Sequence, residues 1–66
     1  MKPSELRQEE DESLRERLSG LKTELFRLRF QAATGQLDKP SRIREVRHDI
    51  ARVETILRQR ELGISG

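Results

Sequence analysis

Residues 24–37 read ELFRLRFQAATGQL and hold the end of an apolar repeat, two aromatic residues, two arginines and a helix stop. The repeat begins upstream, and its members recur at spacings of four, three, four, three and four residues: Leu14, Leu18, Leu21, Leu25, Leu28 and Ala32. This spacing places the six side chains on one stripe of a helix and is typical of close helix pairing. Gly35 follows and accepts the left-handed conformation that ends many helices. The stretch therefore predicts the end of a long amphipathic helix.

A second apolar repeat follows this glycine at spacings of three, four, three and four residues: Ile43, Val46, Ile50, Val53 and Leu57. It is mostly β-branched, whereas the first repeat is mostly leucine. A connection this short forces neighbouring helices to run antiparallel. The sequence therefore predicts an all-α fold: an antiparallel, coiled-coil-like hairpin of two helices.

The predicted domain spans residues 1–66. After a short N-terminal helical turn it has a helix at about 12–34, a turn at 35–39, a helix at about 40–61 and a frayed tail at 62–66. Gly20 lies inside the first long helix, either as a tolerated surface glycine or as a point of close approach.

Three polar residues are candidates for capping these helices. Ser4 precedes Glu5 and fits a cap of the N-terminal turn, and Asp38 lies just before Pro40. The first long helix has two possible starts, at Asp11 or at Ser13, where Ser13 and Glu16 fit a capping box.

The composition excludes several classes of protein. The chain has 66 residues, no cysteine, and two aromatic residues, so it forms one domain at most and has neither disulfides nor thiolate metal sites. No apolar run reaches the roughly twenty residues of a membrane span. A secretory signal is not expected from the N-terminal residues.

The formal charge of +2 is unevenly distributed along the chain. Residues 5–16 hold six acids and two arginines, whereas residues 17–66 hold eleven bases and six acids. This basic majority favours an anionic partner.

A rotation of about 100° per residue assigns the charges to two sides of the hairpin. One side is basic and carries Arg15, Lys22, Phe26, Arg29 and Ala33 together with Arg44, Arg47, His48, Ala51, Thr55 and Arg58. The other side mixes both signs in Arg17, Glu24, Arg27, Gln31, Arg42, Glu45, Asp49 and Arg60. Arginine suits bidentate phosphate contact and stacking on bases. The candidate RNA-binding residues are Lys22, Arg29, Arg44, Arg47, His48, Arg52 and Arg58; the alternative is that these arginines only solubilise the helices.

Phe26 and Phe30 are one turn apart outside the leucine stripe. They either widen the hairpin core or form a contact for a protein partner. His48 has no second histidine or cysteine at ligand spacing, so polar contact with the partner or solvent is expected rather than metal binding. No catalytic set of residues or Gly-rich phosphate loop is present, and a two-helix hairpin has no concave pocket. We therefore expect no catalytic residue, cofactor, metal or small-molecule substrate.

Motifs distributed along nearly the whole chain resemble those of the universal large-subunit ribosomal protein family numbered twenty-nine in the bacterial scheme. They read ELR at 5–7, ELF at 24–26, LRFQ at 28–31, ATGQL at 33–37, RIREVR at 42–47 and DIARV at 49–53. One departure is Glu10, which stands where the family usually has a Ser or Thr cap. The resemblance implies a non-catalytic, cytoplasmic, ribosome-bound protein that binds ribosomal RNA beside the nascent-chain exit. It also implies contact with a neighbouring protein at the tunnel rim.

Other classes of function remain as alternatives to this resemblance. A non-ribosomal hairpin that acts as a protein-interaction or self-association module would need another sustained apolar stripe. Within the two long predicted helices, the only large apolar residues outside the two repeats are Phe26, Phe30 and Ile56. A membrane-surface helix would need a broad free apolar face, which the hairpin uses internally.

Overall fold

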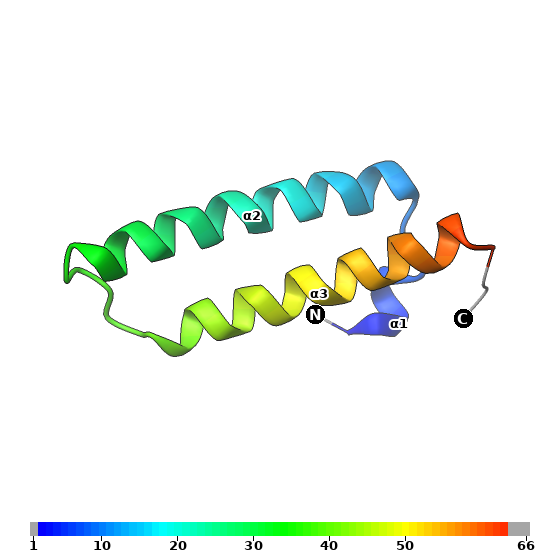
Figure 1. Ribbon diagram of the computed structural model, residues 1–66. Coiled ribbons are helices and arrows are strands. Elements are labelled where there is room, and N and C mark those ends of the chain that lie inside the picture. Colours follow the sequence, from blue (N-terminus) through cyan, green and yellow to red (C-terminus); the bar gives the residue numbers. More distant parts are fainter. Residues whose placement is uncertain (1, 64–66) are drawn as a thin grey trace.

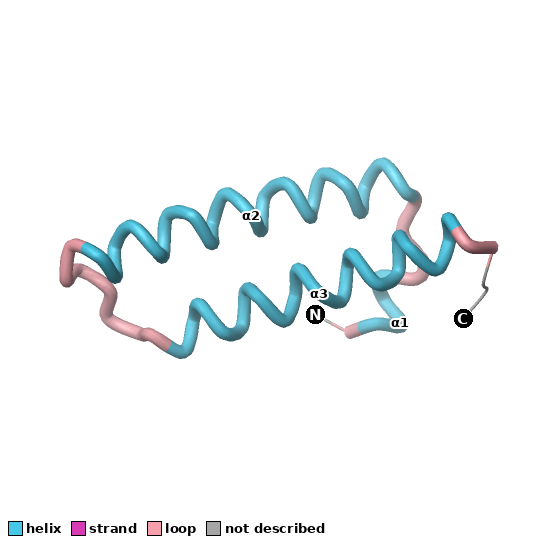
Figure 2. The backbone as a smooth tube through the Cα atoms, viewed as in Figure 1, coloured by secondary structure: helices cyan, strands magenta, loops and turns pink. Residues whose placement is uncertain are grey.

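A computed structural model describes residues 2–63 and contains three helices: α1 (Pro3–Leu6), α2 (Asp11–Ala33) and α3 (Ser41–Glu61). The long helices α2 and α3 pack side by side and antiparallel, and α1 packs on α3 (Figure 1). One loop joins the long helices at one end, and the α1–α2 loop lies at the other (Figure 2). The predicted all-helical hairpin with a short N-terminal turn is confirmed.

The core consists of aliphatic side chains from all three helices. Its fully or nearly fully buried members are Leu6, Leu14, Leu21, Leu28, Val46, Ile50, Val53 and Ile56. Leu18, Leu25, Ile43 and Leu57 are partly buried against this core, as the two repeats predicted, and Leu37 joins them from the loop. Ala32, the last member of the first repeat, is exposed.

Helix α1 buries two side chains that the helical repeats did not include. Leu6 is 1% exposed and Ile56 is 4% exposed. Ile56 lies outside the two repeats but belongs to the same core cluster, and it shares a surface with Pro3 and Arg7 where α1 covers α3. Helix α3 therefore lies between α2 and α1 (Figure 1).

The loop end of α2 is closed by Gly35, as predicted. Gly35 has φ of 75°, and its N–H donates to the carbonyl of Ala32 at 3.2 Å. The next N–H, of Gln36, reaches back to the carbonyl of Gln31 at 2.8 Å. These two bonds form the Schellman arrangement, which satisfies helix-end carbonyls and requires positive φ at the glycine position.

None of the three helices uses a predicted side-chain cap. Lys2, Glu10 and Pro40 occupy the N-cap positions without a capping bond. The predictions for Ser4 and Asp38 were therefore wrong: Ser4 lies inside α1, and backbone carbonyls accept the early α3 amides, as when the N–H of Ile43 donates to Pro40.

The start of α2 is at Asp11, the first of the two predicted positions. A capping box at Ser13 is wrong, because its hydroxyl donates to Glu9 Oε1 at 2.7 Å. Asp11 and Glu12 lie in the first turn, where carboxylates favourably face the positive end of the helix dipole.

Two residues follow the C-terminal end of α3 with backbone hydrogen bonds. Leu62 and Gly63 donate to the carbonyls of Arg58 and Arg60, and Gly63 has φ of 75°. The fraying predicted for this tail stays a prediction. The remainder of the predicted tail, residues 64–66, lies outside the described residues.

Arg60 ties the three helices together at the end opposite the loop. Its guanidinium donates to Asp11 Oδ1 at 2.7 Å and to the carbonyl of Arg7 at 2.9 Å. One side chain of α3 thus holds the end of α1 and the start of α2.

We predict opposite effects for substitutions of Gly35, which follows the end of α2, and of Gly20, which lies inside α2. Gly35→Val should destabilise the chain by about 1 kcal/mol or more, because a β-branched residue is strained at positive φ. Gly20→Ala should stabilise it by up to about 1 kcal/mol, since Gly20 has helical geometry and open space where the Cβ would lie. Urea denaturation followed by circular dichroism measures both, and equal destabilisation by the two substitutions would contradict the assigned geometry.

We predict that Leu6→Ala lowers the free energy of unfolding by about 2 kcal/mol, because it removes most of a fully buried side chain. Leu62→Ala is the matched control and should change stability by less than about 0.5 kcal/mol, since Leu62 is 65% exposed. The same denaturation experiment compares them. If Leu6→Ala matches the control, α1 does not belong to the core.

Candidate nucleic-acid interface

The packed stripes bring the two predicted basic flanks to one side of the hairpin. Arg15 and Leu18 of α2 line a shallow groove together with Thr55 and Arg58 of α3. Nearer the loop, Arg44, Arg47 and His48 line a second shallow groove with Ile43. On α2, Lys22 and Phe26 share a surface with Arg15. We call this the basic side and define it by Arg15, Lys22, Arg29, Arg44, Arg47, His48 and Arg58.

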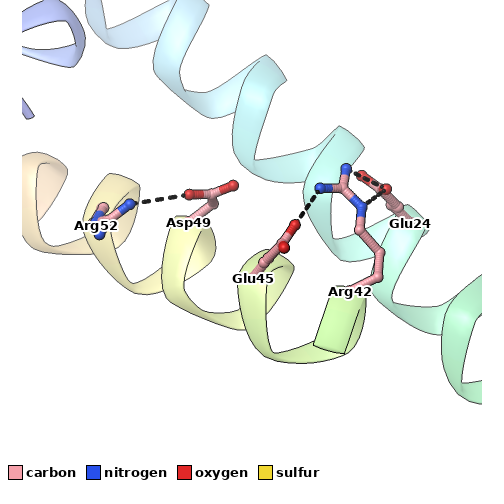
Figure 3. A network of polar contacts seen from close by, with 5 residues as sticks. All are labelled: Glu24, Arg42, Glu45, Asp49 and Arg52. Carbon is pink, nitrogen blue, oxygen red and sulfur yellow. Dashed lines mark hydrogen bonds and ion pairs between the residues drawn. The ribbon is translucent and has the colours of Figure 1, made fainter. Parts of the chain in front are cut away.

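The other side of the hairpin pairs most of its charges within the chain, although Arg27 forms no ion pair with any described residue. Arg42 bridges the helices by binding Glu24 of α2 at 2.7 Å and also binds Glu45 at 3.1 Å (Figure 3). These two carboxylates, Glu24 first, raise the pKa of the Arg42 guanidinium. Arg17 binds Glu9 at 2.9 Å, and Arg60 binds Asp11 at 2.7 Å. We call this the paired side.

Glu9 shows how strongly this side favours the ionised carboxylate. Its pKa is lowered by the hydrogen bond from Ser13 first, and then by Arg17. A lowered pKa in the folded chain means that this contribution to stability exists above the ordinary carboxyl pKa. It is lost as pH falls through the lowered value.

The basic side lacks such compensation. Five of its arginines form no ion pair within residues 2–63, whereas arginines on the paired side bind carboxylates. The five are Arg15, Arg29, Arg44, Arg47 and Arg58. Uncompensated charges on one face sum to a positive field that attracts anions. The two sides therefore differ in pairing as well as in composition.

Two of the predicted RNA-binding residues have other contacts in the structure. Lys22 lies 3.9 Å from Glu54 across the helices, a long and exposed contact that leaves its ammonium accessible. Arg52 lies 3.4 Å from Asp49 and borders the α1 contact beside Pro3 (Figure 3). Arg52 is rotated around α3 by about 140° from Arg47 but by only about 40° from His48, and it shares a surface with Ala51 and Thr55. Its place among the RNA-binding residues stays a prediction.

Both phenylalanines are exposed. Phe26 is 76% exposed and Phe30 is 62% exposed, so the alternative that they widen the hairpin core was wrong. Phe26 borders the basic side, since it shares a surface with Lys22. The core is thus entirely aliphatic, and the two aromatic residues of the chain face outward.

The described part of the chain shows no other kind of site. Among residues 2–63, no group of three or more His, Cys, Asp or Glu side chains is arranged to hold a metal ion. No helix within those residues has the length and apolarity needed to cross a membrane. The grooves on the basic side are open and shallow, with charged rims.

Comparison with known proteins matches residues 4–60 to the family described as Ribosomal L29 protein. This chain belongs to the ribosomal L29 protein family. It is 64% identical over 64 residues to the large ribosomal subunit protein uL29 of Caldanaerobacter subterraneus subsp. tengcongensis, which covers 97% of each chain. It is 66% identical over 63 residues to the protein of the same name from Carboxydothermus hydrogenoformans, covering 96% of this chain and 91% of that one. The family predicted from the sequence motifs is confirmed.

Glu10 is the position at which this chain departs from the usual pattern of the L29 family. Glu10 is the N-cap of α2, where a Ser or Thr was expected, and it makes no capping bond. The preceding residue, Glu9, instead binds both Ser13 and Arg17 from outside the helix. The first turn of α2 is therefore held by a side chain that lies before the N-cap.

Proposed function

We propose that this chain is a structural, non-catalytic constituent of the large ribosomal subunit and acts in translation as a ribosome-bound cytoplasmic protein. The match to the L29 family over residues 4–60 supports this assignment, as do the names of its relatives. A rigid helical hairpin with open, shallow surfaces is consistent with a role in assembly and support.

The basic side of the hairpin binds ribosomal RNA in this proposal. The observation that carries it is the separation of paired from unpaired arginines: Arg42 and Arg60 are held by carboxylates, whereas Arg44 and Arg47 are not. Unpaired guanidinium groups are available for bidentate phosphate contact without first losing an internal partner. Lys22 and His48 lie among them and contribute polar contacts, and Arg52, which shares a surface with Ala51 and Thr55, is a further proposed contact at the edge of this surface.

The proposed location is beside the nascent-chain exit, in contact with a neighbouring protein of the tunnel rim, as the family resemblance implies. Phe26 and Phe30 are the residues proposed for the protein contact. Two adjacent aromatic side chains exposed to 76% and 62% lose contact with water on binding, and aromatic residues are enriched in the buried centres of interfaces.

We predict that neutralising two unpaired arginines weakens retention on the ribosome more than neutralising two on the other side. The double variant Arg44→Gln with Arg47→Gln should dissociate from purified large subunits at lower salt, with a salt slope smaller by about two. The matched control, Arg17→Gln with Arg27→Gln, loses the same charge from the opposite side and should resemble the unmodified chain. An equal or larger loss in the control would mean that the other side faces the RNA.

We predict that Phe26→Ser combined with Phe30→Ser leaves the free chain folded but removes its crosslinks to a neighbouring ribosomal protein. Exposed side chains contribute little to folding, so the free energy of unfolding should change by less than about 0.5 kcal/mol. Chemical crosslinking of large subunits carrying each variant measures the contact, and Leu62→Ser is the control for losing an exposed apolar group elsewhere. Unchanged crosslinks in the double phenylalanine variant would rule out these residues as the contact.

A further inference from the structure

The positive charge of the basic side is concentrated at its two ends. Arg29, Arg44 and Arg47 form a loop-end cluster near the α2–α3 connection. Arg15 and Arg58 form an open-end cluster, and both line the groove at the end of the hairpin opposite the loop, with Glu54 and Glu61 also at its edge. Among the described residues, none of these five arginines has a carboxylate partner.

The surface between the clusters is close to neutral. Lys22 lies 3.9 Å from the Glu54 carboxylate, so the charges at the middle of this side offset each other. Ala51 and Thr55 line the groove beside them. The Thr55 hydroxyl donates to the carbonyl of Ala51 at 2.7 Å, which leaves its oxygen as an acceptor toward the surface.

The spacing of the clusters is the same on both helices. Arg15 and Arg29 are fourteen residues apart on α2, and Arg44 and Arg58 are fourteen residues apart on α3, a rise of about 21 Å in each case. A rigid hairpin 43 Å long and 17 Å wide holds this distance. Two phosphates bound at once, one by each cluster, would be separated by roughly this distance.

We infer that the basic side lies across the minor groove of a double-helical RNA segment, with one arginine cluster on each of its two backbones. This inference rests on the proposed binding of ribosomal RNA. An A-form duplex presents a wide, shallow minor groove lined by 2′-hydroxyls, with a phosphate backbone on either side. Its charge pattern, negative at the edges and neutral in the middle, is complementary to that of the basic side, which is positive at its ends.

A single RNA strand fits this surface less well. A strand running from one cluster to the other carries a phosphate about every 3.4 Å in a helical conformation. Several of these phosphates would then lie over Glu54, whose carboxylate is 54% exposed. In the duplex arrangement the middle of the surface meets 2′-hydroxyls, which can donate to Thr55 and to the Glu54 carboxylate.

Directed hydroxyl-radical cleavage tests this arrangement in the assembled subunit. The chain has no cysteine, so a single introduced cysteine carries the iron–EDTA probe at one chosen position. Ala33→Cys places it one helical turn from Arg29, and Glu61→Cys places it in the groove lined by Arg58. Both residues are exposed, and neither belongs to a cluster.

The expected result is cleavage in two RNA segments that base-pair with each other, one segment from each probe. Glu16→Cys, on an exposed part of α2 rotated away from the basic side, is the matched control and should not cleave this helix. Cleavage by both probes along one unpaired strand, or in two segments that do not pair with each other, would overturn the inference. Neither result affects the proposed function, which fails only if the unmodified chain does not assemble into the large subunit.

A binding measurement with the full chain provides an independent test. A 20-base-pair RNA duplex should bind at least tenfold more tightly than either of its single strands at the same salt. Each of two double variants should weaken duplex binding. One combines Arg15→Gln with Arg58→Gln in the open-end cluster, and the other combines Arg44→Gln with Arg47→Gln in the loop-end cluster. Equal affinity for single strands, or a loss from only one of the two clusters, would contradict contact with two backbones.

Discussion

The packing of the α2 leucine stripe against the β-branched stripe of α3 determines the arrangement of the other residues in this chain. Leu14, Leu21 and Leu28 are buried against Val46, Ile50 and Val53, and this contact sets the rotation of each helix about its own axis. Rotation in turn decides which charges lie together. Because the helices are antiparallel, flanks that are remote in sequence, such as those of Arg15 and Arg58, meet on one side.

Because this apolar contact is small, additional contacts stabilise the end of the hairpin opposite the α2–α3 loop. Helix α1 is one turn long and could not persist in isolation, since short helices are marginal in water. Leu6 gains burial by covering Ile56, and Arg60 binds both the end of α1 and the start of α2. At the loop end the Gly35 cap uses only backbone hydrogen bonds. The two ends of the hairpin are thus closed by different means.

The distribution of ion pairs matters more for function than for stability. Exposed pairs such as Arg17–Glu9 contribute little to folding because solvent screens them. They do offset the charge of the arginines involved, however, so most of the unpaired arginines among the described residues lie on the opposite side, with Arg27 as an exception. On the RNA-binding role proposed for that side, the paired arginines favour one orientation, because they leave the basic side the more attractive face for phosphate.

Much of this protein follows from local patterns in its sequence. Two repeats with helical spacing and a short connection containing Gly35 predicted the hairpin, and the order of the motifs predicted the L29 family. A rotation of 100° per residue also predicted the two sides, because that argument needs only helix geometry and one buried stripe. These features depend on residues within one or two helical turns of each other, so they can be deduced from the chain alone.

The tertiary structure decided what depended on residues far apart in the chain. Leu6 lies in a polar segment without a repeat, and only its contact with α3, some fifty residues away, shows that it belongs to the core. The predicted caps at Ser4 and Asp38 failed because the nearby backbone carbonyls accepted the helix-end amides. Likewise, the sequence placed Arg42 and Arg44 on different sides, but only the reach of Glu24 across the helices showed which of the two is paired. Ion pairing depends on distances between side chains on separate helices, which a one-dimensional pattern does not contain.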